Sequence, residues 1–318
     1  MFLHPTLRLV PDETKFHFMR ARFLGILTSA VLSTASIVLF FHPGLNLGID
    51  FKGGIVIQAE TPRPADFGAL RASFAAAGLA DAGLQRAGTS GVMISLESQA
   101  TDKATDAAVQ RIGAALEKAE PGSKILGTSA VGPTVSAQLL RKGILAVLLS
   151  LVMILAYVWF RFEWEFAVAG VATLVLDITK TIGFLVVTRL PFDLVMVAAI
   201  LTILGYSTND KVVVYDRVRE NLRKFKSMPL RELIDLSINE VLSRTVGTSS
   251  TVFLAALPLA LFGGATLSAF AWTMMFGIIV GTSSSIFIAA PILLFLGEHR
   301  LRRDSRVARP GKIQKKPI

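Results

Sequence analysis

The stretch GYSTNDKVVVYDRVREN, residues 205–221, directly follows the apolar run 192–204. An apolar segment of roughly 17–25 residues can cross a bilayer, yet this one continues into Asp210 and Lys211. A charge in hydrocarbon is costly, so such residues usually face the interior of a helix bundle and have a function there. The predicted fold therefore depends on whether the rest of the sequence also indicates a membrane protein.

The composition favours a membrane protein. Of the 318 residues, 52% are hydrophobic and 18% are charged, which is more apolar than an ordinary soluble protein of this length. Six apolar runs can span a bilayer, at 23–41, 143–160, 166–188, 192–215, 246–262 and 270–296. The first run lacks a small-residue cleavage site at its end, so we expect a retained anchor. We therefore expect an α-helical polytopic membrane protein with six transmembrane helices.

The basic residues indicate an orientation. The formal net charge is +10, and basic side chains gather in segments 1–22, 216–245 and 297–318, whereas segment 42–140 is nearly neutral. Under the positive-inside rule, the three basic segments and both termini are expected in the cytoplasm and 42–140 outside it. Anionic lipid headgroups explain the basic tail, and we expect no nucleic-acid partner.

The segment between the first two spans has the size of a small domain. Strand patterns lie at 55–60, 83–87, 92–97 and 124–129, and helix patterns at 66–77 and 102–119. The order strand, helix, strand, strand, helix, strand is that of a ferredoxin-like α+β domain, which offers a sheet face or edge to a partner. Nothing in it resembles a catalytic set.

Metal and thiol chemistry is not expected. The chain has no cysteine and four histidines, which lie outside the apolar runs without ligand spacing. We expect no metal, no cofactor and no enzymatic activity.

Several motifs together resemble the SecD/SecF family of protein-export membrane proteins. They are GIDFKGG (48–54), GYSTNDKVVVYDRVRENLRK (205–224), LSINEVLSRTVGTSS (236–250), LFGG (261–264) and GTSSSIFIAAP (281–291). The family residues in the first two motifs are Gly48, Asp50, Phe51, Gly53, Gly54, Asp216, Arg217, Arg219, Glu220 and Asn221. From its residues alone, GIDFKGG is also compatible with an ordinary turn at a helix end.

The resemblance implies a fold and a role. The fold would be one six-helix half of an RND-type transporter with a small periplasmic domain. The chain would lie in the bacterial inner membrane, pair with SecD, join the SecYEG translocon and use the proton motive force to promote export. Unfolded exported polypeptides would meet the periplasmic domain, and YajC and YidC are further expected partners.

The resemblance places a proton-linked aspartate at Asp210. Burial in a medium of low dielectric constant favours the neutral form of a carboxylic acid, so such a group can exchange protons near neutral pH. The alternative is a structural aspartate held by Ser207, Asn209 or Lys211.

Two further positions match family residues on the proton pathway. Asp177 matches the aspartate of a His-Asp pair, but Leu176 stands where the histidine is expected; its alternative role is a helix-packing contact. Arg244 matches an arginine that the family pairs with the aspartate of the fourth span; its alternative role is a positive-inside anchor. Thr248 and neighbouring hydroxyls could order a proton path or pack helices.

Two lysines complicate a simple proton carrier. Lys180 follows Asp177 by three residues, so both can lie on one helix face, and we expect them to pair. Lys211 is expected to point toward cytoplasmic water.

Three other functions remain open. The chain could be a translocon scaffold that conducts no protons, or a stand-alone proton-coupled solute transporter. An intramembrane aspartyl protease would use Asp177 and Asp210, but the sequence has no GxGD motif and has YD only at the membrane edge.

Overall fold

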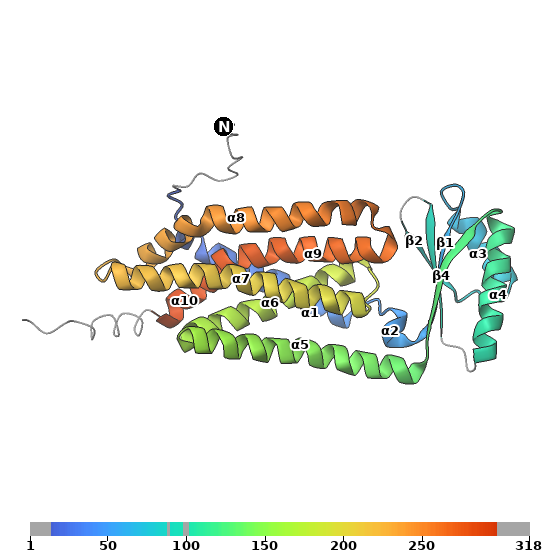
Figure 1. Cartoon of the computed structure of the whole chain (residues 1–318), viewed down its shortest axis with the longest axis horizontal. Helices are drawn as coiled ribbons and strands as arrows, with labels where there is room; N and C mark the ends of the chain where they lie inside the picture. The colour runs from blue at the N-terminus through green and yellow to red at the C-terminus, as the bar shows by residue number, and fades with distance from the viewer. Residues whose placement is uncertain (1–13, 88–89, 98–101, 298–318) are drawn as a thin grey trace, which may run out of the picture.

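The computed structural model describes residues 14–87, 90–97 and 102–297. Long helices pack side by side along the long axis, and a small sheet with its own helices lies at one end (Figure 1). The expected N-terminal segment up to residue 13 and the basic tail from residue 298 lie outside the described residues.

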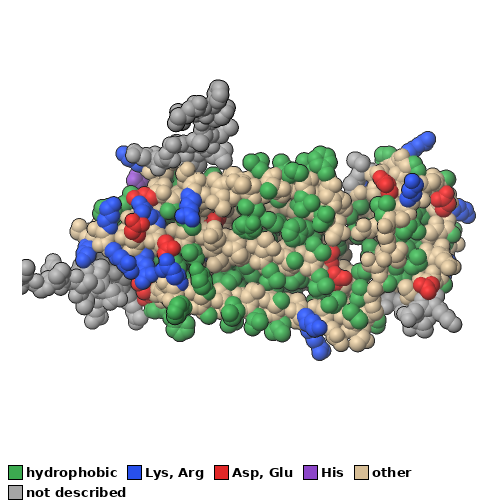
Figure 2. All heavy atoms as spheres, viewed as in Figure 1, with side chains coloured by type: hydrophobic (Ala, Val, Ile, Leu, Met, Phe, Trp, Pro, Cys, Tyr) green, Lys and Arg blue, Asp and Glu red, His purple; other side chains and the backbone are tan. Residues whose placement is uncertain are grey.

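Six helices in this described part are long and apolar enough to cross a membrane. They are α1 (Arg22–Phe41), α5 (Pro133–Arg161), α6 (Trp164–Thr188), α7 (Leu194–Lys224), α8 (Leu230–Phe262) and a last span, Gly264–Leu296. The last span comprises α9 (Gly264–Ser284), a π-helical turn (Ser285–Ala289) and part of α10 (Ala290–Gly297). The middle of the bundle presents mainly hydrophobic side chains (Figure 2). The prediction of six apolar helices is confirmed.

Three helices form the interior of the bundle. In their most apolar windows, α6 and α7 bury 50% of residues and the last span buries 61%, whereas α1, α5 and α8 bury 17%, 11% and 17%. The helices α6, α7 and α9 also pack against one another. Polar residues on the buried faces of these three helices are therefore removed from lipid.

The helices extend beyond the apolar runs. Helix α5 begins at Pro133, ahead of the run 143–160, and α7 continues to Lys224. Helix α8 begins at Leu230, so the segment 216–245, expected as a loop, is mostly helical. A hydropathy window ends where charges begin, but the backbone hydrogen bonds of a helix continue through charged residues.

The small domain contains all six expected elements. They are β1 (Gly54–Glu60), α3 (Phe67–Ala76), β2 (Gly83–Ala87), β3 (Gly91–Leu96), α4 (Asp102–Ala119) and β4 (Lys124–Val131). The strands are antiparallel in the order β2-β3-β1-β4. Asp66 caps α3 by accepting hydrogen bonds from the amides of Gly68 and Ala69, as its N-cap residue type predicts.

One face of this sheet is covered and the other faces the bundle. Alternate residues such as Ile57 and Ile94 are fully buried in a cluster with Leu70 of α3 and Ile112 of α4. The opposite face borders a cavity of about 550 Å³, whose far wall includes the segments 46–49 and 52–53 and Pro191. Among the described strands, β4 pairs with β1 alone, and it is exposed along almost its whole length.

The GIDFKGG segment joins the sheet to the bundle. The Gly48 amide donates to the Phe192 carbonyl at 2.7 Å, and Asp50 accepts a hydrogen bond of 3.0 Å from the amide of Leu194, the first residue of α7. Gly54 has φ +136°, and a Cβ there would collide with the Leu96 carbonyl. The segment therefore fixes the start of the sheet directly to the start of the helix that carries Asp210.

Candidate functional site

The adjacent residues Asp210 and Lys211 face different neighbours. Both side chains are buried, with 6% and 2% of the residue exposed. Successive residues of an α-helix point about 100° apart. Asp210 therefore turns toward α8 and α9, while Lys211 turns toward α6 and the end of α9.

Asp210 is held by neutral hydroxyl groups. Thr282 of α9 donates to its Oδ2 at 3.1 Å, and Ser249 of α8 donates to the same atom at 3.4 Å. The two hydroxyls are 2.7 Å apart. No cation among the described residues forms an ion pair with this carboxylate, so protonation of Asp210 would break no salt bridge.

A small cavity lies beside Asp210. It has a volume of about 10 Å³ and is lined by Ser207, Thr248, Ser249 and Thr282 among others, which suits about one water molecule. Gly281 also lines it, and a Cβ there would come within 2.9 Å of the Ser207 hydroxyl. The cavity therefore has several hydroxyl groups among apolar lining residues such as Val252 and Ile278, and it has room for one water.

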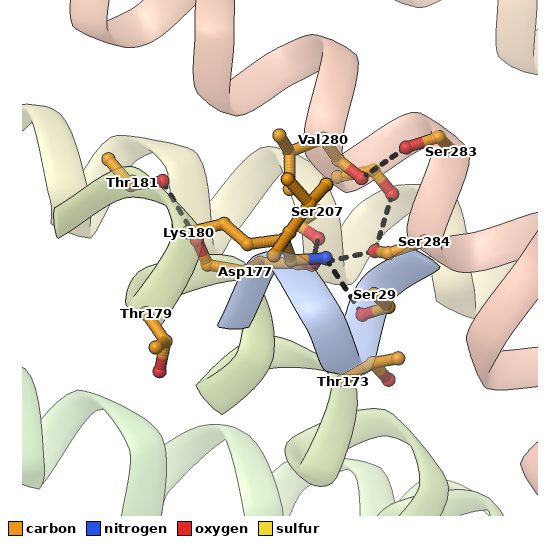
Figure 3. Close-up of polar contacts among 12 residues, drawn as sticks. Ser29, Thr173, Asp177, Thr179, Lys180, Thr181, Ser207, Val280, Ser283 and Ser284 are labelled. Carbon is orange, nitrogen blue, oxygen red and sulfur yellow. Dashed lines mark hydrogen bonds and ion pairs between the residues drawn. The ribbon is translucent and has the colours of Figure 1, made fainter. Parts of the chain in front are cut away.

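Asp177 forms the centre of a second, charged cluster (Figure 3). Its carboxylate makes ion pairs with Lys180 at 3.3 Å and with Lys211 at 3.1 Å. Ser207 and Ser284 donate to its Oδ2 at 2.9 and 2.7 Å. Two ammonium groups and two hydroxyl groups therefore surround this carboxylate.

The lysines extend the cluster to four helices. Lys180 donates to Ser29 of α1 at 3.3 Å, and Lys211 donates to Ser284 of α9 at 3.2 Å and to Ser207 of its own helix. The predicted pairing of Lys180 with Asp177 is confirmed. The expectation that Lys211 points toward water is wrong, because its position on α7 faces the helix that carries Asp177.

Other candidate residues lie outside these contacts. Arg244 is exposed, and within the described part of the chain its guanidinium forms no ion pair with Asp210, contrary to expectation. The Thr248 hydroxyl, which lines the cavity, donates to the Arg244 carbonyl at 2.8 Å. Asn209 is exposed and does not hold Asp210. Thr282, which donates a hydrogen bond to Asp210, was not identified from the sequence. Only the packing of α9 against α7 brings Thr282 close to Asp210.

The motif DRVREN forms a polar clasp between α7 and α8 at the end of the bundle away from the sheet. Arg217 pairs with Glu240 at 2.7 Å, and Asn221 donates to Glu240 at 2.6 Å and to Ser237 at 3.0 Å. Asp216 pairs with Arg161 of α5 at 3.0 Å. These family residues therefore connect helices.

The two remaining charged residues of this motif make further ion pairs. Arg219 lies 3.9 Å from Glu163, and Glu220 pairs with Arg217 at 2.6 Å. Across the residues the structure describes, no three histidine or carboxylate side chains gather closely enough to hold a metal ion.

Family models match most of the chain. The model described as protein export membrane protein SecD/SecF, C-terminal, matches residues 111–299, and the SecD/SecF GG motif matches residues 38–61. The second match contains GIDFKGG, and the first contains both polar sites.

Similar proteins are named as translocase subunits. The chain is 40% identical to protein translocase subunit SecF of Cereibacter sphaeroides over 302 residues, which cover 92% of this chain and 93% of that protein. It is 42% identical to protein translocase subunit SecDF of Brucella abortus, of which it covers 38%. These names describe transport rather than catalysis.

A solved structure shares the fold. The chain matches the crystal structure of SecDF, a translocon-associated membrane protein from Thermus thermophilus, with a TM-score of 0.82 and 32% identity. The match covers 91% of this chain and 39% of that one. A SecDF structure in a super-membrane-facing form matches with a TM-score of 0.69. The chain thus corresponds to about two fifths of SecDF.

Proposed function

We propose, from the premise that this chain belongs to the SecD/SecF family of protein-export membrane proteins, that it is a SecF subunit that pairs with SecD. The pair acts at the SecYEG translocon and uses the proton motive force to promote export of polypeptides. The observation that carries the proposal is Asp210, a buried carboxylate with hydroxyl partners, no salt bridge and a water-sized cavity.

Asp210 is the group that takes up and releases the proton. Its carboxylate becomes neutral when it binds a proton, and no salt bridge has to break for this. Moving one charge across the membrane yields about 2.3 kcal/mol per 100 mV. Asp177 serves the same path as a fixed anion, because it makes ion pairs with two lysines. Arg244 lies one turn from Thr248 of the cavity and acts at the entrance to the path.

The charge distribution supports an orientation in the bacterial inner membrane. Lys and Arg side chains gather at the end of the bundle where α7 passes into α8 (Figure 2), and we assign this end to the cytoplasm. The sheet at the opposite end is then periplasmic (Figure 1). Its strand order and its two helices on one face support a ferredoxin-like domain, which meets unfolded exported polypeptides. YajC and YidC are further proposed partners.

The test is proton-driven export by inverted membrane vesicles that contain this chain and its SecD. We expect Asp210→Asn to abolish the proton-dependent stage of export while the complex still assembles. Asp106→Asn, on an exposed position of α4, is the matched control and should behave as the wild type.

An unchanged proton-dependent stage in Asp210→Asn would overturn the proposal. The scaffold function would then be favoured, since the Asp177 cluster already joins four helices without any change of charge. If the chain, purified without SecD, still moved protons in liposomes, a stand-alone transporter would instead be favoured.

A further inference from the structure

The four buried charged residues of the two polar sites have charges that sum to zero. Asp177 and Asp210 contribute two negative charges, and Lys180 and Lys211 contribute two positive charges. The charged groups that act on Lys211 are Asp177 and Lys180 from α6 and Asp210 from α7. A proton that binds Asp210 alone would leave one uncompensated positive charge in this interior, and uncompensated buried charge is costly.

Ser207 connects the two polar sites. Its hydroxyl accepts a hydrogen bond from the Lys211 ammonium and donates to Asp177 at 2.9 Å. The same residue lines the cavity beside Asp210, together with Ser249 and Thr282. A hydroxyl can donate and accept at once and can rotate. A water in the cavity and Ser207 therefore complete a chain of hydrogen bonds between Lys211 and Asp210.

We propose that the Lys211 amine is a second proton-exchanging group, which trades a proton with Asp210 through Ser207 and one water in the cavity. The inference rests on the proposed proton-driven function and adds a residue to its path. Lys180 has no such connection, because it binds the other oxygen of Asp177 and the Ser29 hydroxyl.

The exchange balances in atoms and charge. The Ser207 hydroxyl first rotates from Asp177 toward the water. The Lys211 ammonium then gives a proton to the Ser207 oxygen while the Ser207 hydroxyl proton passes to the water. The water gives one of its protons to the Asp210 carboxylate. The products are a neutral amine and a neutral carboxylic acid, so the total charge of the four groups stays at zero.

The first test replaces Lys211 by a cation that holds its proton. Arginine cannot be deprotonated in proteins, so Lys211→Arg retains the charge beside Asp177 and removes the exchange. We expect the loss of proton-driven export in vesicles that contain this variant and SecD. Lys224→Arg, on the exposed end of the same helix, should export as the wild type. Wild-type export by an assembled Lys211→Arg complex would overturn the proposal.

The second test needs no altered Lys211 in the measured protein. Side-chain ¹⁵N spectra of the full chain with SecD in lipid nanodiscs report whether each lysine is an ammonium or an amine, and Lys211→Arg identifies the Lys211 signal. We expect this signal to convert from ammonium to amine as the pH is raised through the range of proton-driven export. In Asp210→Asn the conversion should occur at lower pH, because the nearby anion is gone.

The outcomes separate the two proposals. A Lys211 signal that stays ammonium throughout that range overturns the exchange, even if Asp210→Asn abolishes proton-driven export and so upholds the proposed function. Wild-type export by Asp210→Asn overturns both.

Discussion

At the scale of single residues, neighbours in the chain have separate environments. Asp210 rests on two hydroxyls, while Lys211 is enclosed by Asp177, Ser207 and Ser284. Asp177 in turn makes two ion pairs on its two oxygens. The Asp177 carboxylate is therefore shared by two ammonium groups. Its removal would leave more charge uncompensated than the removal of either lysine.

This arrangement predicts that Asp177 contributes strongly to stability. Removing one partner of a buried ion pair costs about 3–5 kcal/mol, because the remaining charge is left uncompensated. We expect Asp177→Asn to lower the free energy of unfolding by about this amount, measured by denaturant unfolding in detergent. Asp106→Asn on the surface of α4 should change it little. Equal stability of both variants would show that the lysines find other compensation.

The sequence predicted part of this site. Lys180 could be paired with Asp177 because residues three apart share a helix face. The location of Lys211 could not be predicted, since it depends on how far α7 is rotated toward α6. Thr282 could not be placed beside Asp210 for the same reason: it lies on α9, and only tertiary packing brings the two helices together.

At the scale of elements, α7 and α8 are joined where both leave the apolar part of the bundle. Asn221 is fully buried there and donates to Glu240 and Ser237. Hydropathy located the apolar part of each helix but not its end. The periodic patterns of the small domain, by contrast, gave its strands and helices closely, because alternation of buried side chains is a local property.

The clasp predicts a specific loss of stability in Asn221→Ala. The substitution removes two hydrogen bonds, which costs about 1–3 kcal/mol. We expect this decrease in the free energy of unfolding of the detergent-solubilised chain. Asn209→Ala on the exposed side of the same helix should be close to neutral. A similar effect of both substitutions would contradict a structural role for the clasp.

At the scale of the whole molecule, two bodies meet over a limited contact. The GIDFKGG segment fixes one side of the sheet to the start of α7. On another side, Gln58 of β1 donates to Thr266 of α9 at 3.4 Å. A cavity of about 550 Å³ also separates the sheet face from the segments at the end of the bundle. We expect that the sheet can pivot about the GIDFKGG segment.

Cross-linking tests whether export needs such a pivot. The chain has no cysteine, so Gln58→Cys with Thr266→Cys provides a unique pair for a short, reducible bismaleimide. We expect the cross-link to stop proton-driven export in vesicles and its reduction to restore it, because the sheet is then held against α9. Each single cysteine variant, treated in the same way, is the control. Full export by the cross-linked protein would contradict a need for movement at this contact.

The one-sided pairing of β4 has a practical consequence for sample preparation. Backbone N–H and C=O groups on the free edge of a strand are a template for a strand of another molecule. Ile125 and Leu126 on this strand are 45% and 64% exposed, and such apolar side chains favour sheet growth over dissociation. Preparations of the chain alone should therefore form oligomers that grow with concentration and with time on storage. The substitution Leu126→Lys should keep such samples monodisperse, as checked by size-exclusion chromatography.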